Sequence, residues 1–362
     1  MTMAHQHHPS ERPGMTKRFA ELDGLRIVAA MVVLMSHLVE TPANNYFGPF
    51  AVLFDGGVAV LIFFVLSGFV ITRLLTSELD RTGSIALGQF YLRRALRIWP
   101  VSYAYILVAI ACLALHLATA RPQEVALAAT HLWNYGMTLT TYDPDSQGQA
   151  IFGHFWSLAL EEQFYWAWPL ALLLLRKRAA GVLITIVAIM PLVRICSYVL
   201  FPFSRGQLNA MFHTGMDPIA LGALLCLFEA RLRPHVARLS PWLLYANLAF
   251  LFVACPELEI HFRGFWSITY GHTLEAASAG LLIMGLIHGP QTRLAWLLRT
   301  PPMQFGGRIS YSLYVWQQLF SLKAAIFPQG ALMTILLSLA AATASYYIIE
   351  LPFLRLKKHV GA

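Results

Sequence analysis

The sequence carries few charges for its length. Only 12% of its 362 residues are Asp, Glu, Lys or Arg, whereas about 25% of the residues of an ordinary soluble domain are charged. Hydrophobic residues make up 57% of the chain and recur in long apolar runs. The composition therefore excludes an ordinary soluble protein and indicates a protein that crosses a membrane several times.

Paired cysteines are also missing. The four cysteines are scattered through apolar runs without a Cys-x-x-Cys motif, so neither a disulfide framework nor a zinc site is indicated. His5, His7 and His8 lie close together, but no nearby residue completes a metal site. The net charge of +8 could serve nucleic-acid binding, yet no contiguous basic and aromatic surface lies outside the apolar runs. We expect neither a metal nor a nucleic-acid partner.

The chain shows no signal peptide, no internal repeat and no soluble domain. Residues 1–18 are polar and lack an apolar core and a cleavage site, and we expect a disordered cytoplasmic leader. The missing repeat gives no support to an inverted-repeat transporter. We expect residues 19–353 to form one membrane domain that acts alone, followed by a basic cytoplasmic tail over residues 354–362.

What the sequence does contain is a series of ten apolar stretches. A membrane-spanning helix needs about 17 to 25 residues, and several of the stretches are at the short end of that range. We therefore expect an all-α polytopic bundle of about ten transmembrane helices. A further segment, residues 125–139, suits a helix at the membrane interface because polar residues interrupt it. The ten stretches are 22–39, 58–75, 98–119, 155–175, 182–201, 211–228, 241–255, 272–288, 309–327 and 331–350.

The basic residues are distributed asymmetrically about these stretches. With ten crossings, 20 of the 26 Lys and Arg residues fall on the side that holds both termini. Positive residues accumulate on the cytoplasmic side of membrane proteins. We expect a multi-pass membrane protein with both termini in the cytoplasm.

The first stretch contains two residues that are costly in lipid, Arg26 and His37. Eleven positions separate them, which is about three helical turns, so both side chains leave the same face of a helix. An ionisable residue at membrane depth usually marks a functional interior. The alternative is structural: Arg26 reaches to the interface and His37 hydrogen-bonds a neighbouring helix.

An arginine cluster precedes the third stretch. Arg93, Arg94 and Arg97 lie within two helical turns and are followed by Pro100, and Arg94 and Arg97 share a face. Guanidinium groups bind phosphates in a bidentate manner. The alternative is that basic residues at this position only set the orientation and contact anionic lipids.

Two adjacent carboxylates, Glu161 and Glu162, lie in the aromatic fourth stretch, shortly after Trp156. Because neighbouring helical residues point about 100° apart, only one of the two is expected to face the same cavity as His37. We choose Glu161. A buried carboxylate needs partners, since an unpaired one would take up a proton.

Several segments together resemble the acyltransferase 3 family of multi-pass membrane O-acyltransferases, which modify bacterial surface sugars, Nod factors and macrolides. The sequence departs from the family at Ile27, where many members have Gly, and at Gln317, where many have His. The resemblance runs from Leu22 to about Pro352 and implies a location in the inner membrane of a bacterium. Its segments are Leu22-Asp23-Gly24-Leu25-Arg26 with His37, residues 63–69 (Phe-Phe-Val-Leu-Ser-Gly-Phe), the arginine cluster before Pro100, residues 156–165 around Glu161, and residues 307–316.

The resemblance implies transfer of an acyl group, acetyl in the first place, from acyl-CoA to a hydroxyl of a glycan, glycolipid or glycosylated metabolite. A sugar hydroxyl needs a general base near pH 7, and an imidazole suits that role. We expect His37 to be the base and Glu161 to orient it or bind the acceptor. Arg26 would stabilise charge on the thioester oxygen or hold the pantetheine arm.

The remaining assignments follow the same resemblance. Arg93, Arg94 and Arg97 would hold the phosphates of acyl-CoA, a donor substrate rather than a resident cofactor. Glu162, Trp156 and Asp217 would contact the acceptor. Two other functions remain open: a transporter or channel with a buried Arg, His and Glu pathway, and an inactive scaffold, for which Gln317 is the hint. A homodimer is also left open.

Overall fold

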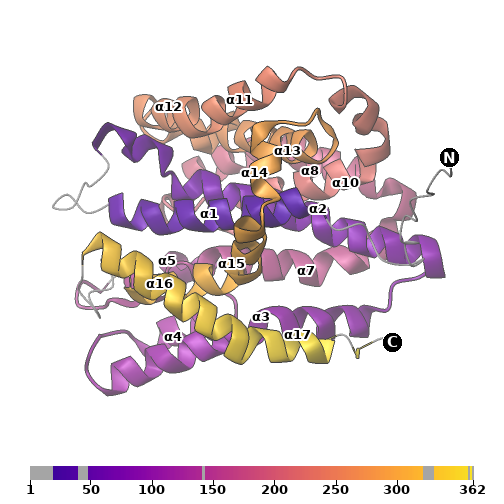
Figure 1. Ribbon diagram of the computed structural model, residues 1–362. Coiled ribbons are helices and arrows are strands. Elements are labelled where there is room, and N and C mark those ends of the chain that lie inside the picture. Colours follow the sequence, from indigo (N-terminus) through magenta and orange to yellow (C-terminus); the bar gives the residue numbers. More distant parts are fainter. Residues whose placement is uncertain (1–18, 40–47, 141–142, 321–329, 358, 361–362) are drawn as a thin grey trace, which may run out of the picture.

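The computed structural model describes residues 19–39, 48–140, 143–320, 330–357 and 359–360. Within these residues every regular element is helical (Figure 1). The longer helices are α1 (Ala20–Val39), α2 (Gly56–Thr82), α3 (Leu87–Ala114), α7 (Phe155–Leu175), α8 (Ala179–Leu200), α10 (Asp217–Val236), α13 (His272–His288), α15 (Pro301–Phe320) and α16 (Ala331–Ser345).

Shorter helical segments connect or extend these helices. The C-terminal one, α17, continues α16 through η8 and reaches into the part of the chain predicted as a basic tail. The shorter segments are η2 (Gly48–Leu53), α4 (Pro122–Ala129), η3 (Trp133–Tyr135), α5 (Gly136–Leu139), α6 (Gly148–Phe152), η4 (Arg176–Arg178), η5 (Pro202–Ser204), α9 (Phe212–Gly215), α11 (Pro241–Ala249), η6 (Phe250–Ala254), α12 (Cys255–His261), η7 (Ser267–Gly271), α14 (Arg293–Leu298), η8 (Tyr346–Glu350) and α17 (Leu351–Lys357).

The all-α fold class is confirmed for the described residues, and the chain is a membrane protein. Five helical segments are long and apolar enough to cross a bilayer: 56–82, 87–114, 155–200, 241–261 and 331–357. The segment 155–200 joins two of the predicted stretches. The other helices contain too many polar residues or are too short, as with the 17 residues of α13. The expected number of about ten crossings therefore stays a prediction.

Helix α2 lies at the centre of the bundle. In its most apolar window 72% of the residues are buried, against 17% to 39% in the other four segments. Asp55 caps its first turn by accepting a hydrogen bond from the Val58 amide at 3.0 Å. Gly83 ends the helix with φ of 74°, a conformation that glycine adopts without strain. The central position of α2 allows it to contribute side chains to the interior on several faces.

Glycines set how closely the helices approach one another. A Cβ atom at Gly68 of α2 would collide with the backbone of α10, and one at Gly222 of α10 would collide with the backbone of α2. Gly307 of α15 faces the backbone of Asp23 in α1 in the same way. Close backbone approach through small residues is a common packing mode of membrane helices. Gly68 thus serves the packing of α2 against α10.

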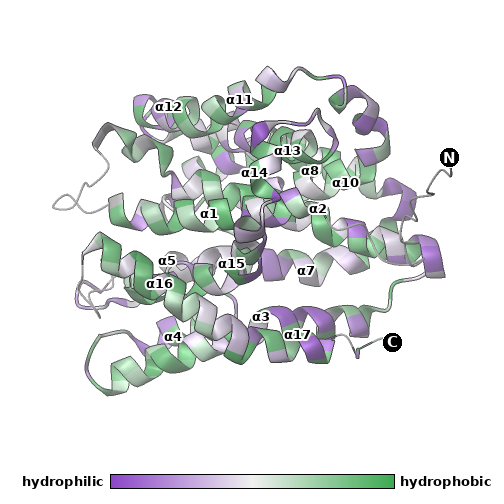
Figure 2. Cartoon of the chain, viewed as in Figure 1, coloured by the Kyte–Doolittle hydropathy of each residue, from purple (hydrophilic) through white to green (hydrophobic). Residues whose placement is uncertain are grey.

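The predicted interfacial segment 125–139 is divided among the short segments α4, η3 and α5. Asn134 fixes it to α7 by a hydrogen bond of 2.9 Å from its amide to Gln163. Figure 2 shows hydrophobic residues along most of the helices and hydrophilic residues gathered where α2, α10 and α17 end. The leader over residues 1–18 and Lys323 lie outside the described residues.

Candidate functional site

A cavity of about 890 Å³ opens at the end of the bundle where α2 and α17 end. Phe19 at the start of the described chain and Lys357 at the end of α17 both line it, so it lies between the two ends of the described fold. Ligand pockets in proteins typically measure about 300 to 1,000 Å³. The cavity therefore has room for a ligand of substantial size. Its walls come from α1, α2, α3, α7, α15, η8 and α17.

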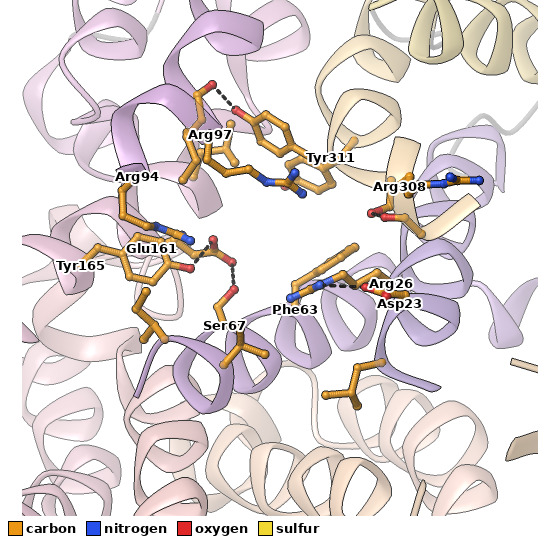
Figure 3. A pocket seen from close by; sticks show the side chains of 18 of the residues that line it. Asp23, Arg26, Phe63, Ser67, Arg94, Arg97, Glu161, Tyr165, Arg308 and Tyr311 are labelled. Carbon is orange, nitrogen blue, oxygen red and sulfur yellow. Dashed lines mark hydrogen bonds and ion pairs between the residues drawn. The ribbon is translucent and has the colours of Figure 1, made fainter. Parts of the chain in front are cut away.

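The walls of this cavity are strongly cationic. Among the described residues, seven basic side chains and two acidic ones, Asp23 and Glu161, line it. Figure 3 shows several of them directed towards a common space. A cleft with one sign of charge and low-dielectric walls concentrates ions of the opposite sign. The cavity thus favours a polyanionic ligand. The basic residues are Arg26, Arg73, Arg94, Arg97, Arg308, Arg355 and Lys357.

Glu161 is held in one orientation by its neighbours. Its carboxylate accepts hydrogen bonds from the Ser67 hydroxyl at 2.8 Å and from the Tyr165 hydroxyl at 3.1 Å. The Arg94 guanidinium lies over the ring of Tyr165, with its Cζ atom 3.9 Å from the ring centroid. Cation and aromatic ring attract one another in this geometry. The side chains of α2, α3 and α7 therefore form one ordered wall (Figure 3).

Two of the cavity arginines are paired with carboxylates behind the wall. Arg97 Nη1 lies 2.8 Å from the buried carboxylate of Glu350. Arg73 Nη1 lies 2.7 Å from Glu229, which also contacts Nε2 of His288 at 2.8 Å. These pairs fix the positions of the two arginines and neutralise part of their charge.

Arg26 occupies the opposite wall, where its Nη1 lies 3.3 Å from Asp23 Oδ1 (Figure 3). The two residues are three positions apart and lie on neighbouring turns of α1. Their backbone approaches α15 closely because Gly307 has no side chain. This packing brings Arg26 next to Arg308 and Tyr311 of α15, which also line the cavity.

His37 does not line the cavity. Its Nδ1 lies 2.8 Å from Oε1 of Gln317 in α15. One turn earlier on α15, Tyr314 forms part of the cavity wall and hydrogen-bonds Ser157 and the His154 carbonyl oxygen. Phe63 packs against Tyr314 with ring centroids 6.0 Å apart. Arg26 and His37 therefore do not share the hollow expected from their common helix face: His37 lies beyond the wall made by Tyr314.

The sequence was also compared with known proteins. It matches the model of one family, described as "Acyltransferase domain", over residues 19–350. The chain belongs to this acyltransferase family. The family that its motifs resemble is thereby confirmed.

Curated relatives of this acyltransferase chain are named for acetyl transfer. A Staphylococcus aureus (strain COL) protein named "Putative O-acetyltransferase SACOL0978" is 28% identical over 357 residues, covering 92% of this chain and 56% of the relative. The peptidoglycan O-acetyltransferase OatA of Listeria monocytogenes is 27% identical, covering 83% of this chain and 49% of its own. The O-acetyltransferase OatA of S. aureus (strain NCTC 8325 / PS 47) is 27% identical, covering 91% and 56%.

The chain spans about half the length of the curated relatives it matches. No solved structure matches the sequence.

The structure brings four of the expected site residues of the acyltransferase to the cavity: Arg26, Arg94, Arg97 and Glu161. The others lie elsewhere. Arg93 contacts Glu78 at 3.4 Å outside the cavity. Glu162 is 2% exposed and does not reach the cavity.

Two more of the expected residues have packing partners of their own. Trp156 packs on Phe64 with ring centroids 5.6 Å apart. Asp217 is fully buried and pairs with Arg194 Nη1 at 2.7 Å, while the Thr273 hydroxyl donates to it. A buried carboxylate with a guanidinium and a hydroxyl partner is electrostatically satisfied.

Several cavity residues were not expected from the sequence. Arg355 and Lys357 entered only the charge count that predicts the orientation in the membrane, and Arg308 entered that count and the segment 307–316. Ser67 and Tyr165 belong to the segments 63–69 and 156–165, but no role in a site was assigned to them. The signal available for the three basic residues was their position at helix ends on the side predicted to be cytoplasmic. Nothing in the sequence alone indicates that α15 and α17 bring them to the arginines of α3.

Proposed function

We propose that this acyltransferase moves an acyl group, acetyl in the first place, from acyl-CoA to a hydroxyl of a glycan, glycolipid or glycosylated metabolite. Family membership supports acyl transfer, and the names of the relatives support acetyl as the group. The observation that carries the choice of donor is the cationic cavity. Acyl-CoA presents a pyrophosphate and a further phosphate, and guanidinium groups bind such groups in a bidentate manner.

The donor enters from the end at which the basic residues lie. Arg94 and Arg97 from α3, with Arg308, Arg355 and Lys357 from the C-terminal half of the chain, line the cavity together and hold the phosphates. The pantetheine arm then extends along the cavity past Arg26, with the thioester towards Tyr314. In this proposal about ten helices cross a bacterial inner membrane, both termini lie in the cytoplasm, and the cavity opens there.

The chemical step needs a base and a site for negative charge. The acceptor oxygen attacks the thioester carbon and its proton passes to His37. The tetrahedral intermediate carries its charge on the former carbonyl oxygen, and Arg26 stabilises that charge. The C–S bond then breaks and the ester is released, and the CoA thiolate takes up the proton held by His37, which returns to its neutral form. Glu161 holds the acceptor or the arm of the donor in register.

The wall between the cavity and His37 must open for this step. Tyr314 and Phe63 form that wall, so the thioester reaches His37 when these side chains turn aside. In the closed arrangement the wall separates the base from water that enters the donor cavity. Keeping water from the thioester favours transfer over hydrolysis.

The proposal is tested with radiolabelled acetyl-CoA and the purified protein in lipid nanodiscs. Peptidoglycan-derived oligosaccharides and membrane glycolipids serve as acceptors. Label is expected in the acceptor fraction with the native chain and not with His37→Ala. His213→Ala is the matched control, because His213 is exposed and stacks on Tyr135 with ring centroids 5.9 Å apart, away from the cavity.

The same protein in sealed proteoliposomes tests the alternative: uptake of label without any covalent product, equal in the native chain and in His37→Ala, would instead support a transporter or channel. Label in the acceptor with both forms would leave acyl transfer standing and remove His37 as the base.

A further inference from the structure

A series of hydrogen bonds runs from His37 through the side chains of Gln317 and Gln318 to a backbone carbonyl group. Oε1 of Gln317 lies 2.8 Å from Nδ1 of His37. Nε2 of Gln317 donates a long hydrogen bond of 3.4 Å to Oε1 of Gln318, and Nε2 of Gln318 donates to the carbonyl oxygen of Ala150 at 2.6 Å. The three side chains connect α1, α15 and α6.

The carbonyl oxygen of Ala150, at the backbone end of this series, determines which group donates in every one of its hydrogen bonds. A carbonyl oxygen can only accept, so the group of Gln318 that faces Ala150 is its NH₂. Its Oε1 is then an acceptor, and the group of Gln317 that faces it must be NH₂, since two oxygens would repel each other. The remaining oxygen of Gln317 points at His37. Nδ1 of His37 therefore carries the hydrogen and donates it.

Burial makes this arrangement costly to reverse. Gln317 is fully buried and Gln318 is 4% exposed, so neither amide exchanges its partners with bulk water. A buried polar group that loses its hydrogen bond costs about 1 to 3 kcal/mol. If the amide of Gln317 were turned over, its NH₂ would face the Nδ1 hydrogen of His37. Its oxygen would then face Oε1 of Gln318.

We infer that Gln317 is a positioning residue which fixes the tautomer of His37, with hydrogen on Nδ1 and the lone pair on Nε2. In a neutral imidazole one nitrogen donates and the other accepts, and the hydrogen bond of the first sets the role of the second. Nε2 is then the atom that takes the proton of the acceptor hydroxyl. The inference rests on the proposed role of His37 as the base.

Gln317, one of the two positions at which the sequence departs from the family pattern, thereby has a function. Gln317 cannot transfer a proton, but its amide oxygen accepts from an imidazole without competing for the proton that moves in the reaction. It acts through His37 and does not need to touch the substrate. The residue is 280 positions from His37 in the sequence.

Two substitutions at the same position separate the hydrogen bond from the packing. Gln317→Met keeps a side chain of similar length and removes the acceptor. Gln317→Glu keeps an acceptor towards Nδ1 of His37 and gives up only the long 3.4 Å donation to Gln318. We expect Gln317→Met to lower kcat about 10- to 100-fold with the KM for acetyl-CoA changed less than about twofold, and Gln317→Glu to retain most of the rate that Gln317→Met loses.

A spectroscopic readout reports the tautomer without relying on turnover. Protein with ¹⁵N-labelled histidine is measured by solid-state NMR in lipid, and the His37 signals are found by difference from His37→Ala. The native chain is expected to show a protonated Nδ1 and an unprotonated Nε2, and Gln317→Met a mixture of both tautomers. Folding of each variant is checked by its thermal melting and elution profile.

Comparison of Gln317→Met with His37→Ala distinguishes failure of this inference from failure of the proposed function. If His37→Ala is inactive while Gln317→Met retains the native kcat and the native ¹⁵N pattern, the positioning role is overturned and the base stands. A native signal with the hydrogen on Nε2 overturns it as well. If His37→Ala keeps full activity, the proposed base is wrong and the inference falls with it.

Discussion

The guanidinium of Arg97 lies 2.8 Å from the carboxylate of Glu350, a residue 253 positions later that is only 1% exposed. Ser312 also donates to this carboxylate at 2.9 Å. The pair joins α3 to η8, and both elements contribute residues to the cavity wall. Arg97 therefore has a structural role in addition to its proposed contact with the donor.

These two roles of Arg97 can be separated by a double substitution. Arg97→Ala leaves the Glu350 carboxylate buried without its cation, and we expect a loss of about 3 kcal/mol in the free energy of unfolding. Adding Glu350→Gln removes the unpaired charge and should restore most of that stability. The KM for acetyl-CoA should stay raised in the double variant, because the cation is still missing. Thermal melting and steady-state kinetics measure the two effects.

A return of both stability and KM to native values in the double variant would mean that Arg97 serves the fold alone. The donor phosphates would then depend on the other basic residues of the cavity.

Arg93 and Arg94 are neighbours in the sequence but face different surroundings. Arg94 lines the cavity over the Tyr165 ring, and Arg93 contacts Glu78 outside it. We expect Arg94→Ala to raise the KM for acetyl-CoA about 10- to 100-fold, the loss of one charge-assisted contact. Arg93→Ala should change it less than about threefold, since Arg93 and its half-buried partner Glu78 lie outside the cavity and an isolated ion pair near the surface contributes little. Equal effects of the two substitutions on KM would contradict the placement of the donor.

Glu161 and Glu162 offer a second adjacent pair for comparison. Glu161 lines the cavity with two hydroxyl donors, whereas Glu162 is buried away from it. We expect Glu161→Gln to lower kcat about 10- to 100-fold, because positioning groups near the reacting atoms have effects of this size. Glu162→Gln should leave kcat within about twofold. The kcat values of the two variants, measured at saturating acetyl-CoA, show whether Glu161 acts in the cavity or has a purely structural role.

Tyr314 holds the wall between the donor cavity and His37 through its hydroxyl group. Its bonds to Ser157 and to the His154 carbonyl are lost in Tyr314→Phe, while the ring remains. With the wall less firmly closed, we expect acceptor-independent hydrolysis of acetyl-CoA to rise by about tenfold, the effect of roughly one hydrogen bond. Release of free CoA thiol without acceptor measures it. An unchanged rate of hydrolysis would show that Tyr314 does not control access to the thioester.

Features that depend on one helix were predictable from the sequence, and those that depend on helix packing were not. Periodicity and charge identified Arg26, Arg94, Arg97 and, of the two adjacent carboxylates, Glu161, and the cavity contains these four. Arg93 of the same predicted cluster lies outside it. Periodicity also placed Arg26 and His37 on one face of α1. It could not show that Tyr314 of another helix separates them.

The close contacts between helices explain this limit. Gly307 facing Asp23, and Gly306 facing Ile27, set the depth at which α15 lies against α1. Because α15 packs at this depth, Arg308 and Tyr314 line the cavity and Gln317 contacts His37. Such a register depends on residues almost 300 positions apart, and no local pattern contains it. The departure at Gln317 was visible in the sequence, but its partner was not.

The most direct test of the account is an experimental structure of the protein in a lipid nanodisc with acetonyl-CoA, a donor analogue whose acyl carbon cannot be transferred. The account predicts the phosphates of the analogue against Arg94, Arg97 and Arg308, and its carbonyl group beside Arg26 on the side of Tyr314 and His37. An analogue bound outside this cavity, or a cavity that stays free of it at saturating concentration while the protein transfers acetyl groups, would contradict the account.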